Sequence, residues 1–323
     1  MRRLLCLALA TLAGTFAAAP SRAACEAQET FAIAVHGGTS RAGRDHTPRM
    51  LFQTLLLKAM RVELASGAAA LDVVEQSVRF MEDSGLFNAG RAAISNRDGF
   101  VETDASIMDG RTLEAGAVAS MRLLRNPITA ARLVMEKTPH VMMVGDRGEA
   151  AAVALGADTV TADYFVNNKT ADAPANHGTV GAVVLDRCGN LAAGTSTGGY
   201  GAKIPGRVGD SPVIGAGTYA RNGSVAVSAT GHGEYFIRFN AAASIAARVT
   251  HGGEDLASAS AAVIEAMAKA GGGRDGRGGV IVVGADGSVA TPFSTDGMIR
   301  ATTTNTVEPV AMVYGKGLKP SDG

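Results

Sequence analysis

Residues 178–185 read Gly-Thr-Val-Gly-Ala-Val-Val-Leu, and residues 186–190 continue Asp-Arg-Cys-Gly-Asn. The first stretch has the length and apolar composition of a buried strand, and the second has the composition of a turn. Residues 191–195 return as a second strand, so this segment predicts a β-hairpin. Residues 158–178 are polar and have no clear period, which predicts a long exposed linker. The junction between Gly178 and Thr179 therefore joins an accessible segment to a buried one.

Thr179 could act as a catalytic nucleophile if the chain is cut at this junction. It would then carry both a hydroxyl and a free α-amine, and an α-amine with a pKa of about 8 can act as the base for its own hydroxyl. No histidine would be needed as the base. Taken alone, however, a Gly-Thr pair before a strand is most often only the start of a strand.

The remaining patterns predict helices and strands on both sides of the linker. Helical patterns, the first opened by a Thr47 cap and Pro48, cover residues 47–66, 71–81, 126–137, 147–155, 234–249 and 257–268. Strand patterns cover residues 31–35 with a turn at 36–38, then 99–105, 113–121, and a second hairpin at 279–283 and 288–293. Such grouped runs predict an α+β fold in which sheets pack face to face with helices outside.

Three segments after the hairpin place polar groups near its open end. Thr197 ends the returning strand, which brings it within hydrogen-bond reach of Thr179, although Ser and Thr are also common at strand ends. Arg207 and Asp210 lie in a Gly-rich loop, where a guanidinium can hold a carboxylate and an aspartate can hold an ammonium. They suit the two ends of a free amino acid; the alternative is a surface ion pair.

Residues 229–234 read Ala-Thr-Gly-His-Gly-Glu and lead into a helical pattern. The hydroxyl of Thr230 and the N–H of Gly231 are suited to stabilising an oxyanion, and a helix N-terminus favours negative charge. The alternative is an ordinary helix cap. His232 and His36 are interpreted as structural rather than catalytic, because the amine supplies the base.

Composition and the N-terminus narrow the class of protein. The 30 basic and 30 acidic residues balance, so nothing favours nucleic acid or an anionic membrane as a partner. Residues 1–23 have a basic start, an apolar run and small residues at the end, which predicts a cleaved signal peptide and a periplasmic or secreted protein; an uncleaved anchor is the alternative. Cys25 and Cys188 then remain, and the sequence leaves open whether they pair.

Eight short stretches, in order along residues 31–300, resemble the plant-type asparaginases, or isoaspartyl peptidases, among the N-terminal-nucleophile hydrolases. They are residues 33–38, 86–90, 96–99, 104–110, 178–183, 195–199, 207–210 and 229–234. The resemblance implies a four-layer αββα sandwich that cuts itself between Gly178 and Thr179. The products would be an α chain of residues 24–178 and a β chain of residues 179–323, and the mature unit would be a homodimer of αβ pairs.

The same resemblance implies roles for particular residues. Thr179 would be the nucleophile, assisted by Thr197, with Thr230 and Gly231 as the oxyanion hole and Asn88 orienting the surroundings of Thr179. The substrate, asparagine or a β-aspartyl dipeptide, would be bound by Arg207, Val208, Gly209, Asp210, Thr230, Gly231, His232 and Gly233. No organic cofactor is implied. A structural sodium ion would be held by the backbone carbonyls of Met81, Glu82, Ser84, Phe87, Ala89 and Arg91.

Two alternative functions stay open at this point. Glycosylasparaginases look similar but typically carry Asp before the nucleophilic threonine, whereas Gly178 stands there in this chain. A non-catalytic amino-acid-binding protein would keep Arg207 and Asp210 without hydrolysing anything. Residues 39–49 and 271–279 depart from the family pattern, so the ranking of asparagine against β-aspartyl dipeptides does not follow from the sequence.

Overall fold

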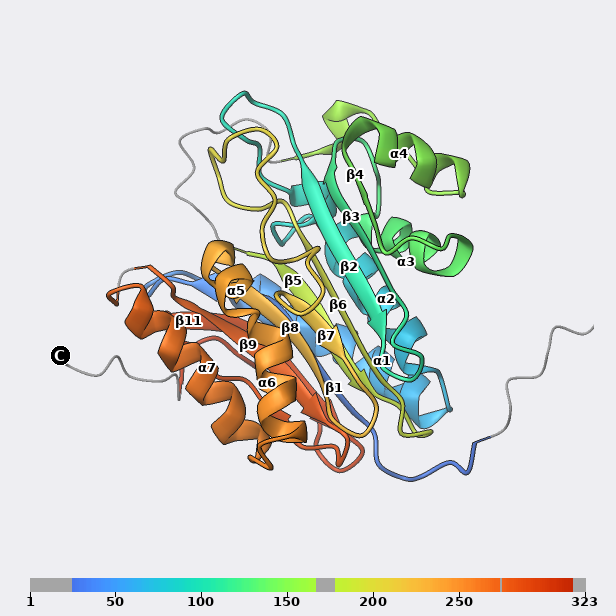
Figure 1. Cartoon of the computed structure of the whole chain (residues 1–323), viewed down its shortest axis with the longest axis vertical. Helices are drawn as coiled ribbons and strands as arrows, with labels where there is room; N and C mark the ends of the chain where they lie inside the picture. The colour runs from blue at the N-terminus through green and yellow to red at the C-terminus, as the bar shows by residue number, and fades with distance from the viewer. Residues whose placement is uncertain (1–24, 167–177, 274, 316–323) are drawn as a thin grey trace, which may run out of the picture.

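Two β-sheets organise the chain, and helices pack on them (Figure 1). The computed structural model describes residues 25–166, 178–273 and 275–315. Among these residues the larger sheet has the spatial order β12 (Val310–Met312), β11 (Gly297–Thr304), β1 (Ala32–Ser40), β5 (Val180–Leu185), β6 (Leu191–Thr197), β2 (Thr103–Asp109), β3 (Ala115–Met121) and β4 (Met142–Val144). The smaller sheet has the order β10 (Val289–Ala290), β9 (Gly278–Gly284), β8 (Val225–Gly231) and β7 (Thr218–Ala220). The fold is therefore mixed α/β with two sheets.

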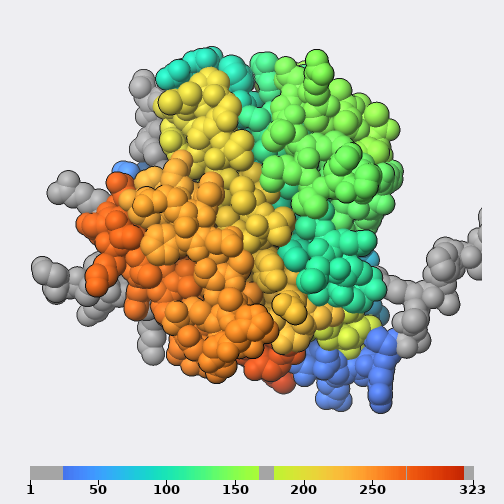
Figure 2. All heavy atoms as spheres, in the orientation of Figure 1, coloured from blue at the N-terminus to red at the C-terminus, as the bar shows by residue number. Residues whose placement is uncertain are grey.

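The helices divide between the two sheets (Figure 1). The larger sheet packs against α1 (Thr47–Ala65), α2 (Ala70–Asp83) and α3 (Pro127–Lys137), with α4 (Gly145–Ala154) beside β3 and β4. The smaller sheet packs against α6 (Ala241–Thr250) and α7 (Leu256–Ala270), and α5 (Gly233–Phe239) precedes them. Two short 3-10 turns cover Gly90–Ala92 and Ala162–Tyr164. In Figure 2, α5 to α7 in orange and the α3–α4 region in green cover two parts of one face, with the segment between β6 and β7 in yellow between them.

The hairpin of β5 and β6 lies in the middle of the larger sheet. Its two strands pair antiparallel with Leu185 opposite Leu191, as predicted. Alternate β5 side chains enter different cores: Ala182 and Val184 pack with the helices, whereas Val183 and Leu185 pack with the smaller sheet. Because both faces of β5 are buried, its sequence is a continuous apolar run rather than an alternating one.

The second hairpin, of β9 and β10, is also confirmed, as are the helices that begin near residues 47, 71, 127, 147 and 257. Several predicted boundaries are wrong. The helix predicted over 234–249 is two helices, because Asn240 adopts a left-handed conformation with φ 46°. The strand predicted over 99–105 is β2, which begins only at Thr103, and β8 and β11 were not predicted.

The start of the chain also differs from its prediction in two places. β1 does not turn at His36 but runs on to Ser40, with an irregularity in its pairing between His36 and Thr39. Thr47 is the first residue of α1 rather than its cap; His46 stands at the cap position and its side chain makes no capping hydrogen bond. Residues 1–23 and most of the linker, residues 167–177, lie outside the described residues.

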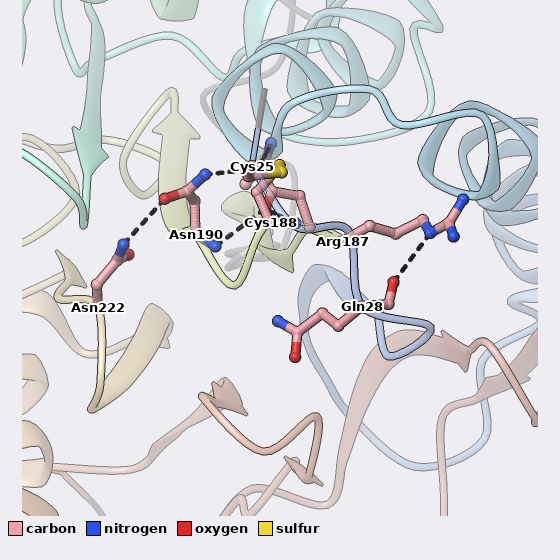
Figure 3. The surroundings of a disulfide bond; sticks show 8 residues. Cys25, Gln28, Arg187, Cys188, Asn190 and Asn222 are labelled. Atoms are coloured by element: carbon pink, nitrogen blue, oxygen red, sulfur yellow. Dashed lines mark hydrogen bonds between the residues drawn. A yellow bond between two sulfur atoms is a disulfide. The ribbon is translucent and has the colours of Figure 1, made fainter. Parts of the chain in front are cut away.

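Cys25 and Cys188 form a disulfide that joins the start of the described chain to the β5–β6 turn (Figure 3). Hydrogen bonds surround it: Gln28 N donates to Arg187 O at 2.7 Å, and Arg187 Nε donates to Gln28 O at 3.0 Å. Arg187 Nη1 also donates to the carbonyl of Ala65 at the end of α1, at 2.8 Å. The pairing that the sequence left open is therefore present and lies within a hydrogen-bonded corner.

Candidate active site

Thr179 lies directly before β5, and its hydroxyl meets the end of β6. Thr179 Oγ1 donates to Thr197 Oγ1 at 2.9 Å, and both side chains are buried. The hairpin register, which sets Val180 opposite Ser196, produces this contact. Thr197 Oγ1 also accepts from Gly199 N at 3.0 Å, so its orientation is fixed on the far side. A hydroxyl held in this way is well placed to be a nucleophile if a base is supplied nearby.

A buried histidine supports Thr179 from β1. His36 Nδ1 donates to the carbonyl of Thr179 at 3.0 Å, and its Nε2 accepts from Ser228 Oγ of β8 at 2.9 Å. This pair of bonds uses both nitrogens of a neutral ring. Gly181 makes the arrangement possible, because a Cβ there would lie 2.0 Å from Ser228 Oγ and 2.5 Å from His36 Nε2. His36 is therefore a positioning residue in this structure, in keeping with its interpretation as structural.

The burial of His36 predicts that the folded protein becomes less stable as the pH falls. Burial lowers the pKa of His36 to about 3, whereas an unfolded histidine has a pKa of about 6.5. Between pH 6.5 and pH 3, the unfolded chain takes up a proton on His36 and the folded chain does not. The free energy of unfolding should therefore fall as the pH drops from 6.5 towards 3, by up to about 1.4 kcal/mol per pH unit from this group.

Urea unfolding of wild type and His36→Gln between pH 7 and pH 4 measures this effect. The free energy of unfolding of the variant should change less steeply with pH than that of wild type. Glutamine can still donate to the Thr179 carbonyl, but it does not titrate. His140→Gln, which makes the same substitution at an exposed position, is the matched control. An unchanged slope in His36→Gln would contradict the assignment.

Arg207 and Asp210 lie together in the same cavity as Thr179. The cavity is small, about 10 Å³, and is lined by Thr179, Thr197, Gly199, Tyr200, Arg207, Asp210, Ser211 and Gly231. The Arg207 guanidinium forms a two-pronged pair with Glu234, with Nε to Oε1 at 3.0 Å and Nη2 to Oε2 at 3.1 Å, and it lies over the Tyr200 ring. Glu234 thus shows that Arg207 is oriented to hold a carboxylate in its fork.

Asp210 is the complementary group. Its side chain is buried, and its Oδ2 has no hydrogen-bond partner among the described residues. Burial raises the pKa of Asp210 to about 7. A buried carboxylate oxygen without a hydrogen bond is costly, and an ammonium group in this cavity would relieve that cost.

The residues between and after this pair have mainly steric roles. Gly209 and Gly233 lie against the Arg207 guanidinium, where a Cβ at Gly233 would come within 2.7 Å of Asp210 Oδ1 and 2.8 Å of Arg207 Nη2. Val208 separates Arg207 from Gly209 on the same loop. His232 does not line the small cavity; its Nε2 is 3.4 Å from Glu234 and its Nδ1 is 3.7 Å from Asp275, at the wall of a neighbouring cavity.

Thr230 and Gly231 end β8, opposite Gly279 and Gly278 of β9. The Thr230 hydroxyl is fully buried and makes no hydrogen bond to any described residue. Gly231 has φ 141°, a conformation that side chains rarely adopt, and it lines both this cavity and the neighbouring one. Of the two groups predicted as an oxyanion hole, Gly231 therefore lines the cavity of Thr179, whereas Thr230 is a buried donor that does not line it.

Asn88 holds the loop that follows β6. Its Nδ2 donates to Gly199 O at 2.6 Å, and its Oδ1 accepts from Ile94 N at 2.9 Å. Its backbone carbonyl also accepts from Gly198 N at 3.0 Å. Asn88 is therefore connected to Thr179 through the Gly198–Gly199 segment and Thr197.

Two buried ionisable residues at the site, Lys203 and Asp104, were given no role from the sequence, and Glu82 was named only for its backbone carbonyl. Lys203 is fully buried, and its Nζ donates to Glu102 O at 2.8 Å. Asp104 is also buried, and burial raises its pKa while the charge of Lys203 lowers it. Glu82 accepts from Ser196 Oγ at 2.6 Å, next to Thr197. Their positions depend on the tertiary fold, so only the pairing of distant segments could have revealed them.

The segment predicted to hold sodium runs from the end of α2 to the 3-10 turn at Gly90. Three of its carbonyls already accept hydrogen bonds: Met81 O from Ser84 Oγ at 2.8 Å, Phe87 O from Ala89 N at 2.8 Å and Arg91 O from Val166 N at 3.0 Å. Each carbonyl keeps a second lone pair, and oxygen donors suit a hard cation. The carbonyls of Met81, Glu82, Ser84, Phe87, Ala89 and Arg91 are oxygen donors of the type that sodium takes, and sodium at this segment stays a prediction. Among the described residues, no group of three or more His, Cys, Asp or Glu side chains could hold a metal ion.

Comparison with known sequences decides the family. The profile of the family described as asparaginase matches residues 29–173 and 166–313. The chain belongs to the asparaginase family. Relatives within it include the isoaspartyl peptidase of Escherichia coli (strain K12), 46% identical over 299 residues that cover 83% of this chain and 91% of the relative.

Two further asparaginase-family relatives cover most of their own length. The isoaspartyl peptidase of Salmonella typhimurium is 46% identical over 296 residues, which cover 83% of this chain and 94% of the relative. The human isoaspartyl peptidase/L-asparaginase is 38% identical over 287 residues, which cover 82% of this chain and 91% of the relative. In this asparaginase-family chain, no helix among the described residues has the length and apolar character needed to cross a membrane.

Proposed function

We propose that this chain cuts itself between Gly178 and Thr179 and then hydrolyses L-asparagine and β-aspartyl dipeptides with Thr179 as the nucleophile. The observation that carries the proposal is the 2.9 Å contact between the Thr179 and Thr197 hydroxyls inside a cavity that also holds Arg207 and Asp210. The relatives, an isoaspartyl peptidase in Escherichia coli and an isoaspartyl peptidase/L-asparaginase in humans, support the same substrates.

Self-cleavage would begin with attack of Thr179 Oγ1 on the carbonyl carbon of Gly178. The peptide C–N bond breaks, the Gly178 acyl group passes to the oxygen as an ester, and the Thr179 nitrogen takes up a proton to become a free amine. Water then hydrolyses the ester, which restores the hydroxyl and leaves a carboxylate on Gly178. The products are an α chain of about residues 24–178 and a β chain of residues 179–323.

The mature site would use the new amine as its base. The amine accepts the Thr179 hydroxyl proton while Oγ1 attacks the side-chain carbonyl of the aspartyl unit. Thr230 Oγ1 and the Gly231 N–H stabilise the developing oxyanion. Ammonia or an amino acid leaves with the proton, and water hydrolyses the β-aspartyl ester at Thr179 to release aspartate. No organic cofactor takes part.

Substrate binding would exchange one carboxylate for another. In the continuous chain the Arg207 fork holds Glu234, and the cavity of about 10 Å³ is too small for an aspartyl unit. The substrate α-carboxylate would take the place of Glu234 on Arg207, and the substrate ammonium would meet Asp210. Val208, Gly209, His232 and Gly233 would form the walls of the enlarged site.

We also propose the layer arrangement, the oligomeric state, a bound ion and the location of the protein. The two sheets and their helices would form a four-layer αββα sandwich, and the mature unit would be a homodimer of αβ pairs. A sodium ion on the carbonyls of the Met81–Arg91 segment would stiffen the support of Asn88 and take no part in the chemistry. Removal of residues 1–23 as a signal peptide would place the protein in the periplasm or outside the cell, with no membrane or nucleic-acid partner.

Aspartate release from a substrate panel tests the proposed function. The mature protein should release aspartate from asparagine and from β-Asp-Leu. Turnover confined to N-acetylglucosaminyl-asparagine would favour a glycosylasparaginase-like amidase instead. Binding of aspartate without turnover of any substrate would favour a non-catalytic binding protein.

The disulfide changes how self-cleavage will look on a denaturing gel. Cys25 precedes Thr179 and Cys188 follows it, so the bond joins the two proposed products. The cleaved wild type should run as one band without reductant and as two bands with reductant. Cys25→Ser should give two bands under both conditions. Two wild-type bands without reductant would contradict the cross-link.

A further inference from the structure

A second, larger cavity adjoins the site of the proposed chemistry. It has a volume of about 430 Å³, and Gly178, Asn88, Tyr200 and Gly231 contribute to its wall. Tyr200 and Gly231 also line the small cavity around Thr179. Because Gly178 lines the larger cavity and Thr179 the smaller one, the two cavities meet at the Gly178–Thr179 peptide bond. If the aspartyl unit occupies the small cavity, the group that leaves on the other side of the scissile bond must lie in the larger one.

The wall of the larger cavity is rich in arginine. Its charged lining residues are Arg41, Arg44, Arg49, Arg277, Asp275 and Asp296. Both acids are already engaged: Asp296 accepts from Arg277 Nη2 at 2.9 Å and from Ala42 N at 3.3 Å, and Asp275 Oδ1 is 3.7 Å from His232. Of the remaining arginines, Arg41 and Arg44 lie between β1 and α1, and Arg49 lies in the first turn of α1.

Arg49 is the arginine whose surroundings point most clearly to a ligand. Its Nε donates to the carbonyl of Leu86 at 2.7 Å, and its Nη1 lies 3.4 Å from His46 Nδ1. Within the described residues its guanidinium contacts no carboxylate. Burial and the nearby charge of Arg44 both lower the pKa of Arg49, so this cation is held where its charge is uncompensated. An anion in the cavity would compensate it and use the free edge of the guanidinium.

We propose that the larger cavity is the leaving-group subsite and that Arg49, with Arg44 and Arg41 beside it, binds a carboxylate of the departing amino acid or peptide. This inference rests on the proposed function and names its preferred substrate class. β-Aspartyl peptides with a free carboxylate on the leaving residue should be hydrolysed in preference to asparagine, whose leaving group is ammonia. An acidic leaving residue, which brings a second carboxylate, should be preferred to a basic one.

The mature wild-type protein tests the subsite with a matched pair of substrates, β-Asp-Leu and β-aspartyl-leucinamide, which differ only in the leaving-group carboxylate. The ratio of their kcat/KM values should favour the free acid by about tenfold, as expected for one charge-assisted contact. β-Asp-Glu should likewise be hydrolysed faster than β-Asp-Lys.

Variants then assign the effect to the arginines. Arg49→Gln should bring the acid-to-amide ratio close to one, and Arg49→Lys should restore part of it. Arg41→Gln removes an exposed cation at the rim that holds no described hydrogen bond through its side chain, and it should lower the ratio without disturbing the Leu86 contact. Arg111→Gln, on the exposed turn between β2 and β3, is the matched control and should keep the wild-type ratio.

The outcomes separate this inference from the function on which it rests. Equal wild-type rates on the acid and the amide, or a wild-type ratio in both Arg49→Gln and Arg41→Gln, would overturn the subsite while leaving hydrolysis intact. Failure of the wild type to hydrolyse any substrate of the panel would overturn the proposed function, and the subsite with it.

Discussion

Thr179→Ala is expected to abolish both self-cleavage and hydrolysis, because each reaction uses the same hydroxyl as its nucleophile. The purified variant should remain a single chain on a reducing gel, and its hydrolysis of asparagine and β-Asp-Leu should fall by at least about four orders of magnitude. The fold should survive, since alanine removes one hydroxyl whose described hydrogen bond goes only to Thr197.

Two controls make this result specific. Thr179→Ser keeps a hydroxyl at the same position and should retain both reactions at reduced rates. Thr112→Ala removes an exposed hydroxyl in the β2–β3 turn and should behave as wild type. Two bands on a reducing gel from Thr179→Ala would remove Thr179 from the proposal.

Discrimination between β-linked and α-linked aspartyl dipeptides is the second large effect. The mature protein should hydrolyse β-Asp-Leu at least about 30-fold faster than α-Asp-Leu, measured as kcat/KM by leucine release. In an α-linked dipeptide the α-carboxylate is consumed by the peptide bond, so Arg207 would face an uncharged amide. A buried arginine without its partner costs about 2–5 kcal/mol, which is roughly 30-fold or more in specificity.

Arg207→Lys is the control for this prediction, because the contact that it tests is two-pronged. The guanidinium already holds both oxygens of Glu234, through Nε and Nη2. Lysine keeps the charge but cannot make a two-pronged contact, so Arg207→Lys should weaken binding of β-Asp-Leu and narrow the β-to-α ratio. Self-cleavage should continue, because it involves no free amino acid. Comparable leucine release from both dipeptides by the wild type would contradict the proposed binding mode.

Local signals in the sequence were sufficient for the parts of the fold that do not depend on distant partners. The β5–β6 hairpin follows from its apolar run and turn residues, and the contact between Thr179 and Thr197 follows from the hairpin register. Helices with Pro near their start, such as α1 and α3, were placed within a residue or two. These features are determined by residues that are close together in the sequence.

The rest depends on tertiary context. β11 was not predicted, because its sequence Gly297–Thr304 mixes Gly, Arg and Ala with strand-forming residues and has no apolar alternation, whereas its pairing with β1 and β12 makes it a strand. The break at Asn240 occurs inside an apolar periodic stretch that reads as one helix. The pairing of Arg207 with Glu234, and the buried Lys203 beside Asp104, join segments that no local pattern connects. The cavity lined by Arg49 likewise combines residues from both halves of the chain.

The most direct test of the central claim is the mass and N-terminal sequence of the chains in purified, reduced wild-type protein. Self-cleavage before Thr179 predicts a smaller chain that begins Thr-Val-Gly-Ala-Val and extends through Gly323, together with a larger chain that ends at Gly178. A single uncut chain that hydrolyses asparagine, or a new N-terminus anywhere other than Thr179, would contradict it.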